Sequence, residues 1–180
     1  MKIKNTPPAL PLWHSPSLWS EANNTIAELI DKNLENLNQA IMAAHEIEKN
    51  LNSIFPVVNR LCMPTCPMCP DPCCLNAKIW FDFKDLLFLH LQRLVIAPSQ
   101  PIGKMSETCR YIGHHGCTLD RIARPWMCTW YLCPSQTGRL RKDCPSEYDN
   151  IQRVFNDIKS ERGKMEDGFI TAIMPHFSFL

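Results

Sequence analysis

Five of the ten cysteines fall within thirteen residues, CMPTCPMCPDPCC, which run from Cys62 to Cys74. Such density is typical of a disulfide framework, a zinc site or an iron–sulfur cluster. Cys66 and Cys69 have CxxC spacing, in which a tight turn aims both sulfurs at one ion about 2.3 Å away. The adjacent Cys73 and Cys74 cannot comfortably aim at the same tetrahedral ion. The doublet therefore indicates two centres, a polynuclear cluster, or one thiol with a different task.

The other five cysteines lie in a second region, TCRYIGHHGCTLDRIARPWMCTWYLCPSQTGRLRKDC. Stretches of 7, 10, 4 and 10 residues separate them, so no single local loop can make one site from them. The fold must gather them around the first cluster, and metal bonds formed on folding can offset the entropy of closing such loops. These cysteines are Cys109, Cys117, Cys128, Cys133 and Cys144.

The overall charge points to no polyanionic partner. The chain has 19 basic and 18 acidic residues and a formal net charge of +1, which gives no signal for nucleic acid or an anionic membrane. The first residues, MKIKNTPPALPLWHSP, lack the apolar core of a secretory signal. The longest apolar stretch, 86–97, is short and interrupted by polar residues. We expect a cytoplasmic protein with no nucleic-acid partner and no membrane span, and in a reducing compartment a metal or redox site is favoured over disulfides.

Cysteine boxes follow one another along the chain in a definite order: Cys66-x-x-Cys69-x-x-x-Cys73-Cys74, then Cys109, then Gly116-Cys117-Thr118-Leu119 leading to Arg124-Pro125-x-x-Cys128. In order and composition these boxes resemble the CxxCxxCC domain family of zinc or iron chelators, also called YkgJ-like, and Cys144 fits its trailing cysteine. The resemblance covers about residues 62–146 and implies a metal site without implying a reaction. One extra residue before Cys73, and Pro70 where the family usually has a small residue, leave the number of metal ions open.

The resemblance and the spacing together give the expected metal ligands. Eight cysteines are expected to bind metal: Cys66, Cys69, Cys73, Cys74, Cys109, Cys117, Cys128 and Cys144. Cys62 and Cys133 lie outside the family pattern and are candidate additional ligands, for a second site or a redox step. His114 and His115 are weighed as ligands or proton shuttles, but an exposed turn is the favoured explanation. No catalytic residue can be named, so the question of an enzymatic activity stays open.

Zinc and an iron–sulfur cluster both accept four thiolates. An iron–sulfur cluster, of the 4Fe-4S type, is the expected cofactor because the thiols exceed the need of one zinc ion and because Cys-Pro pairs recur. Aromatic residues such as Trp126 also flank Cys128 and can shield a cluster from water. Zinc is the alternative. Arg124 and Arg110 are expected to compensate the negative charge of the thiolates and to donate hydrogen bonds toward sulfur, although plain surface charge explains Arg110 equally well.

A long helix is expected from 20 to 55, because apolar residues recur there at alternating spacings of three and four. This stripe consists of Ile30, Leu34, Leu37, Ile41, Ala44, Ile47, Leu51 and Ile54. Pro56 is expected to end the helix. Shorter helices are expected at 83–96 and from 146 onward. The predicted fold class is mainly α, with a long N-terminal helix and shorter helices around an irregular cysteine-rich metal-binding region.

Four segments are predicted: an irregular N-terminal tail (1–18), a long amphipathic helix (19–56), a cysteine-rich metal-binding domain (57–165) and an apolar C-terminal tail (166–180). The expected function is that of an iron–sulfur protein for electron transfer or cluster-dependent chemistry within a larger complex. A zinc-clasped structural or protein-interaction module and a metal-handling protein are the alternatives. A protein partner, or a second copy of the chain, is expected to bind through the helix at 20–55.

Overall fold

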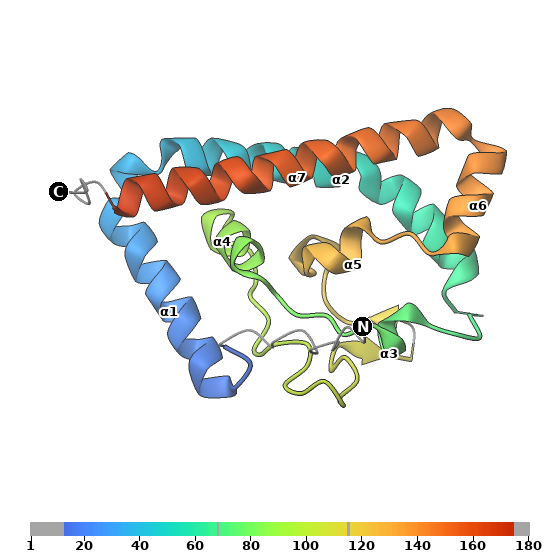
Figure 1. Ribbon diagram of the computed structural model, residues 1–180, viewed down its shortest axis with the longest axis horizontal. Coiled ribbons are helices and arrows are strands. Elements are labelled where there is room, and N and C mark those ends of the chain that lie inside the picture. Colours follow the sequence, from blue (N-terminus) through green and yellow to red (C-terminus); the bar gives the residue numbers. More distant parts are fainter. Residues whose placement is uncertain (1–12, 68, 115, 175–180) are drawn as a thin grey trace, which may run out of the picture.

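The computed structural model describes residues 13–67, 69–114 and 116–174. Within these ranges the chain forms seven α-helices, two 3-10 turns and one short hairpin (Figure 1), and the predicted mainly α class is confirmed. The helices are α1 (Pro16–Asn33), α2 (Asn38–Thr65), α3 (Cys73–Asn76), α4 (Phe83–Leu91), α5 (Trp126–Trp130), α6 (Pro134–Asp143) and α7 (Pro145–Ile173). The 3-10 turns are η1 (Leu34–Asn36) and η2 (Arg121–Ala123), and the antiparallel strands are β1 (Ile112–Gly113) and β2 (Gly116–Cys117).

The long N-terminal helix is present, but a turn divides it into α1 and α2. Asn33 and Leu37 leave helical geometry at either end of η1, with φ/ψ of −121°/17° and −88°/9°. Asparagines at 33, 36 and 38 favour such a break, because their side chains compete with the backbone for hydrogen bonds. Leu37 is fully buried at the bend. The break allows α1 to turn away from α2 and lie beside α4 (Figure 1).

Pro56 does not end the helix as expected, because α2 continues through Pro56 and Pro64 to Thr65. Pro56 removes one backbone donor, but both Pro56 and Asn52 lie on the exposed face. The carbonyl group of Asn52 can therefore bond water instead of the missing N–H. Ile54 and Val58 are buried on the opposite face, and their packing offsets the cost of the proline.

Helices α2 and α7 lie side by side and antiparallel, and they form the main contact of the fold (Figure 1). Much of the predicted apolar stripe faces this contact, since Ala44, Ile47, Leu51 and Ile54 are buried, whereas Leu34 of η1 is exposed. One hydrophobic cluster runs from Trp19 in α1 to Ala172 in α7. Residues 166–173, expected to begin a C-terminal tail, are part of α7 and of this core. The rest of that tail from 175 and the N-terminal residues 1–12 lie outside the described residues.

Two glycines of α7 occupy opposite environments. A Cβ at Gly168 would meet the backbone nitrogen of Ala40 at 3.0 Å, whereas a Cβ at Gly163 would meet nothing within 4 Å. Gly168 is therefore the point of closest approach of α7 to α2, and Gly163 is open.

Gly168→Leu should destabilise the protein by about 1–3 kcal/mol, because the side chain must push α7 away from α2. Gly163→Ala should stabilise it by about 1 kcal/mol through helix propensity alone. Urea unfolding followed by circular dichroism measures both effects. Equal shifts of the same sign in the two variants would show that the contact at Gly168 is not tight.

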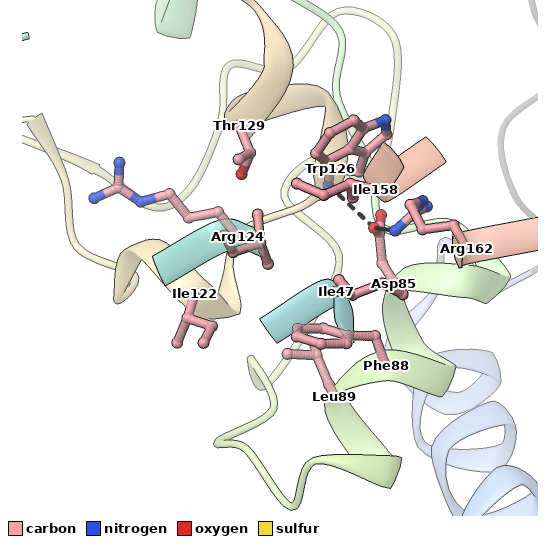
Figure 2. Close-up of a pocket in the computed structure, with 11 residues that line it drawn as sticks. Ile47, Asp85, Phe88, Leu89, Ile122, Arg124, Trp126, Thr129, Ile158 and Arg162 are labelled. Carbon is pink, nitrogen blue, oxygen red and sulfur yellow. Dashed lines mark hydrogen bonds and ion pairs between the residues drawn. The ribbon is translucent and has the colours of Figure 1, made fainter. Parts of the chain in front are cut away.

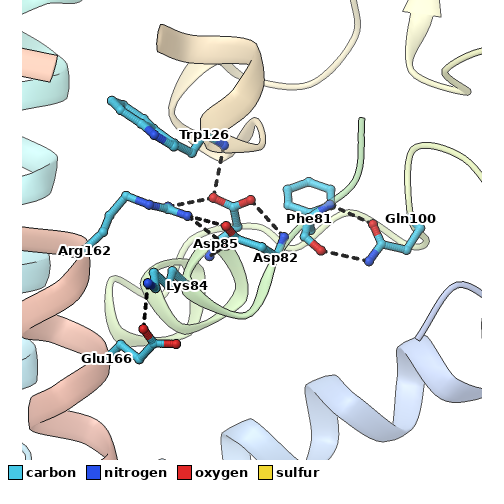
Figure 3. A network of polar contacts seen from close by, with 8 residues as sticks. All are labelled: Phe81, Asp82, Lys84, Asp85, Gln100, Trp126, Arg162 and Glu166. Carbon is cyan, nitrogen blue, oxygen red and sulfur yellow. Dashed lines mark hydrogen bonds and ion pairs between the residues drawn. The ribbon is translucent and has the colours of Figure 1, made fainter. Parts of the chain in front are cut away.

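A polar network holds α4 against α5 and α7 (Figure 3). The guanidinium group of Arg162 donates to Asp85 Oδ1 at 2.7 Å and to both carboxylate oxygens of Asp82 at 2.8 Å. The backbone N–H of Trp126 donates to the same Asp85 oxygen at 3.0 Å. Asp82 and Asp85 also form the capping box that begins α4. Burial raises the pKa of the Asp85 carboxyl to about 6, against the lowering effect of Arg162.

His90, one of the polar residues that interrupt the apolar stretch 86–97, is half-buried near the end of α4. Its Nε2 lies 3.0 Å from the side-chain oxygen of Asn23 on α1, and burial lowers its pKa. His90 therefore joins α4 to α1. Among the described residues, no helix has both the length and the apolar character needed to cross a membrane.

Candidate metal centre

The C-terminal end of α2 carries the first two sulfurs. Cys62 and Cys66 lie one helical turn apart, with the backbone N–H of Cys66 bonded to the carbonyl of Cys62 at 2.9 Å. Residues four apart lie on the same helical face, so both sulfurs point to one side. Burial raises the pKa of the Cys66 thiol to about 11, and the neighbouring Cys62 raises it further. The two thiols are close enough to repel each other as thiolates.

Helix α6 begins at this same end of α2 (Figure 1). Its N-cap residue, Cys133, accepts a hydrogen bond through sulfur from the backbone N–H of Gln136. The amide oxygen of Gln136 accepts from the backbone N–H of Cys133 at 3.3 Å. The amide nitrogen of Gln136 lies 3.5 Å from the Cys62 sulfur and 3.6 Å from the Cys66 sulfur. One buried amide side chain thus contacts three cysteines.

The doublet Cys73 and Cys74 begins the short helix α3. The two thiols contact each other through their side chains, so each influences the pKa of the other. Burial raises the pKa of Cys73 to about 11, with further increases from Cys74 and Cys133. Burial also raises the pKa of Cys74, with increases from Cys117, Cys66 and Cys109. Cys73 therefore has Cys133 as a neighbour, whereas Cys74 has Cys66 and the hairpin cysteines Cys117 and Cys109 as neighbours.

The hairpin of β1 and β2 brings Cys109 and Cys117 together. Cys117 pairs with Ile112 across the hairpin, and Cys109 lies just before β1. The backbone N–H groups of Tyr111 and Ile112 donate to the sulfur of Cys109, although burial keeps the pKa of this thiol above its usual value. Such N–H donors stabilise a thiolate, and hydrogen bonds of this kind accompany metal-bound sulfur.

Cys128 lies on α5 and is the fourth sulfur of this neighbourhood. Burial raises its pKa, and Cys117, Cys109 and Cys74 raise it further, whereas Arg124 opposes the rise. The hydrogen bond from Trp126 to Asp85 fixes the start of α5. The buried network of α4 and α7 therefore also determines where Cys128 lies.

Eight of the ten cysteines thus form two groups. The hairpin group is defined as Cys74, Cys109, Cys117 and Cys128, and the helix-end group as Cys62, Cys66, Cys73 and Cys133. Cys66 and Cys74 also influence each other across the boundary, so the two groups adjoin. All ten cysteines are free thiols. Among the described residues, no three His, Cys, Asp or Glu side chains already stand in positions that could hold a metal ion. Metal binding would therefore require the sulfurs of a group to draw together.

Two of the expected metal ligands, Cys69 and Cys144, belong to neither group. Cys144 lies at the junction of α6 and α7, where its backbone caps both helices. The ten residues of α6 place it about 15 Å from the Cys133 end of that helix. Cys69 follows the end of α2 in a turn, with its N–H bonded to the Cys66 carbonyl at 3.3 Å. The structure brings the Cys69 backbone to the helix-end group but places Cys144 well away from it.

The charged and aromatic residues expected around the metal differ in their contacts. Arg124 donates to the carbonyl of Leu119 at 3.0 Å and toward that of Cys117 at 3.5 Å, so it holds the hairpin beside Cys128. Arg110 instead pairs with Glu107 at 3.1 Å. The ring of Trp126 packs edge-on against Phe155. Trp130 and Tyr131, which also flank Cys128, are 40% and 44% exposed. His114 is exposed in the hairpin turn, and His115 lies outside the described residues.

The molecule has a small cavity and a larger hollow, and no cysteine of the hairpin group or the helix-end group lines either of them. A cavity of about 20 Å³ lies behind α5, between Asp85, Thr129 and the side chains of Arg124 and Arg162 (Figure 2). That volume suits one water molecule. A hollow of about 340 Å³ opens beside α1, near Trp19, and no cysteine is among its lining residues.

Gln136, Asp85 and Arg162 were missed by the sequence reasoning. A local signal existed for Gln136 only. Cys133-x-x-Gln136 has the spacing of a capping box, with cysteine in the place of serine or threonine. Asp85 and Arg162 are 77 positions apart and belong to separate helical patterns. No protein-family model, curated protein or solved structure matches the chain, so the resemblance to the CxxCxxCC family stays a prediction.

Arg124→Met should weaken metal binding about 10- to 100-fold, because the hairpin loses its tie and Cys128 loses a nearby positive charge. Arg110→Met removes the same charge from a residue paired with Glu107 and should leave binding unchanged. Competition with a chromophoric chelator measures both affinities. A larger loss in Arg110→Met than in Arg124→Met would contradict this assignment.

Proposed function

We propose that the protein binds metal through cysteine thiolates, as an iron–sulfur protein for electron transfer or cluster-dependent chemistry. The observation that carries the proposal is the hairpin group. Its four sulfurs come from α3, the loop before β1, β2 and α5, and they influence one another electrostatically. Four thiols from four segments of the chain are the ligand set that tetrahedral zinc and cuboidal clusters require, and burial raises the pKa of three of them, Cys74, Cys109 and Cys128.

The donors around this group support thiolate ligation. N–H groups point at the Cys109 sulfur, and Arg124 adds positive charge beside Cys128. Both effects stabilise the deprotonated sulfur that a metal needs. The raised pKa values of the metal-free thiols mean that metal must displace their protons, so binding will release protons to solvent.

Iron–sulfur is proposed ahead of zinc on the number of thiols and the recurrence of proline after Cys66, Cys69 and Cys133. The expected shielding by Trp130 and Tyr131 gives no support, since both side chains are exposed. The proposal keeps the resemblance to the CxxCxxCC chelators and a reducing, cytoplasmic setting for the free thiols.

An electron-transfer role requires a protein partner. The apolar stripe of α2 packs on α7 within the chain, so a partner or second copy at 20–55 would bind the exposed residues of this segment. Leu34 and Met42 are the large apolar side chains available there, at 48% and 70% exposure.

The test is to purify the full chain without oxygen and to measure its metal, its acid-labile sulfide and its visible spectrum. Iron with sulfide and a broad absorption near 400 nm is the expected result. Colourless protein with stoichiometric zinc would replace the iron–sulfur proposal with a zinc-clasped scaffold. Protein that retains no metal, and whose ten thiols all react freely, would refute metal binding altogether.

A further inference from the structure

The helix-end group is a second cluster of thiols, and the resemblance to known chelators accounts for only part of it. Two of its members, Cys62 and Cys133, lie outside the family pattern. Cys62 and Cys66 come from the end of α2, Cys133 from the start of α6, and Cys73 from α3. Three separate elements thus direct sulfur toward one place.

Gln136 supplies the geometric link between these elements. It is 4% exposed, and its amide nitrogen lies within 3.6 Å of both the Cys62 and Cys66 sulfurs. The same nitrogen donates to Thr65 Oγ1 at 3.1 Å. The backbone N–H of Gln136 donates to the Cys133 sulfur. Three sulfurs therefore lie beside the N–H donors of one buried residue, and such donors can stabilise the thiolates that form when a metal displaces the thiol protons.

The doublet explains how two groups can adjoin without sharing a ligand. Cys73 and Cys74 contact each other, and one thiol of this adjacent pair can serve each group. Cys73 has Cys133 as an electrostatic neighbour, whereas Cys74 has Cys117 and Cys109, with Cys66 as a further neighbour across the boundary. A single tetrahedral ion has room for four sulfurs, so metal binding by all eight sulfurs would need two centres.

We propose that Cys62, Cys66, Cys73 and Cys133 bind a second thiophilic metal centre, zinc or cluster iron, with the Gln136 side chain donating hydrogen bonds to two of its sulfurs. The centre is separate from that of the hairpin group, and it rests on the proposed function in requiring that the chain bind metal. It clasps the end of α2 to the start of α6. Cys144, at the far end of α6, takes no part in it.

The experiment counts metal per chain in the full-length protein as purified and in single variants. The wild type should hold two centres. Cys133→Ser should lose the helix-end centre and keep the other, and Cys128→Ser should do the reverse. Ser135→Ala, an exposed neighbour on α6, should keep both. Circular dichroism establishes that each variant is folded, and Cys62→Ser replaces Cys133→Ser if the latter does not fold.

The outcomes separate the two proposals. A wild type without metal refutes the proposed function. If the wild type binds metal but Cys133→Ser and Cys128→Ser each lose all of it, the chain has one shared cluster. That result overturns the second centre only. A loss in Cys144→Ser as large as that in Cys133→Ser also overturns the assignment. Cobalt(II) added to metal-free protein gives an independent readout, because thiolate-to-cobalt absorption should fall by about half in Cys133→Ser and in Cys128→Ser and should stay unchanged in Cys144→Ser.

Discussion

Arg162→Met should lower the free energy of unfolding by about 3–5 kcal/mol at neutral pH. The side chains of Arg162 and Asp85 are 7% and 5% exposed, and the guanidinium group is the counter-ion of the buried carboxylate. Removing one partner of a buried ion pair leaves the other charge uncompensated. Chemical denaturation at pH 7.5 measures the loss.

The matched control is Lys164→Met, on the same helix. Lys164 pairs with Glu161 at 2.7 Å, but its side chain is 58% exposed, so its loss should cost less than about 1 kcal/mol. The double variant Asp85→Leu with Arg162→Met should recover part of the stability, because no charge is then left buried. A cost of Arg162→Met no larger than that of the control would contradict a buried role for the pair.

The stability lost in Arg162→Met should also depend on pH. Burial raises the folded-state pKa of Asp85 to about 6, above the ordinary value of about 3.9. The folded protein therefore holds this proton more tightly than the unfolded chain, and the resulting stability is present below about pH 4 and lost as pH rises through about 6. Without Arg162 the carboxyl gains still more from protonation. The variant should thus be closer to the wild type at pH 5 than at pH 8.

Removing the proposed metal should unfold the cysteine region and spare the helical core. None of the described residues from Cys62 to Trp80 is fully buried, so apolar packing contributes little to holding this segment. The binding free energy of structural metal is of the order of 10–16 kcal/mol in small zinc sites, and it is folding free energy. Amide hydrogen exchange across Cys62–Trp80 should rise by at least tenfold when a strong chelator is added.

The core provides the internal control. Ile151 and Phe155 of α7 are 1% and 7% exposed and belong to the main cluster, so their amides should keep their protection. The far-UV helical signal should fall only slightly. Uniform loss of protection along the chain would show that metal holds the whole fold, and no change anywhere would show that metal holds none of it.

The helical class and the buried stripe could be predicted from the sequence because both follow from local periodicity. The ends of the helices could not be predicted in this way. The helix predicted at 83–96 ends at Leu91, because Arg93 adopts a left-handed conformation with φ of 53°. The N–H of Leu94 then bonds back to the carbonyl of Leu89. Glycine usually occupies such a position, and an arginine in the sequence does not predict the end of a helix.

The candidate site likewise has features that follow from local sequence patterns and features that do not. CxxC spacing and the adjacent doublet are local patterns, and they indicated thiol chemistry from the sequence alone, while two centres, a polynuclear cluster and a separate task for one thiol all stayed open. The assignment of each sulfur to a group depends on contacts across the fold, such as that of Gln136 with Cys62, 74 positions away. Pairings of this kind arise from helix packing, which no local pattern encodes.

Both groups take their last cysteine from late in the chain, and this has a consequence for biosynthesis. Cys62 precedes Cys133 by 71 positions. At roughly 5–20 residues per second, the first thiols wait roughly 4 to 14 s on the ribosome for their last partner. Cys128 and Cys133 are then made within about a second of each other. For the two proposed centres to form, the nascent chain must keep its early thiols reduced and unpaired until that moment, when both centres become able to close almost together.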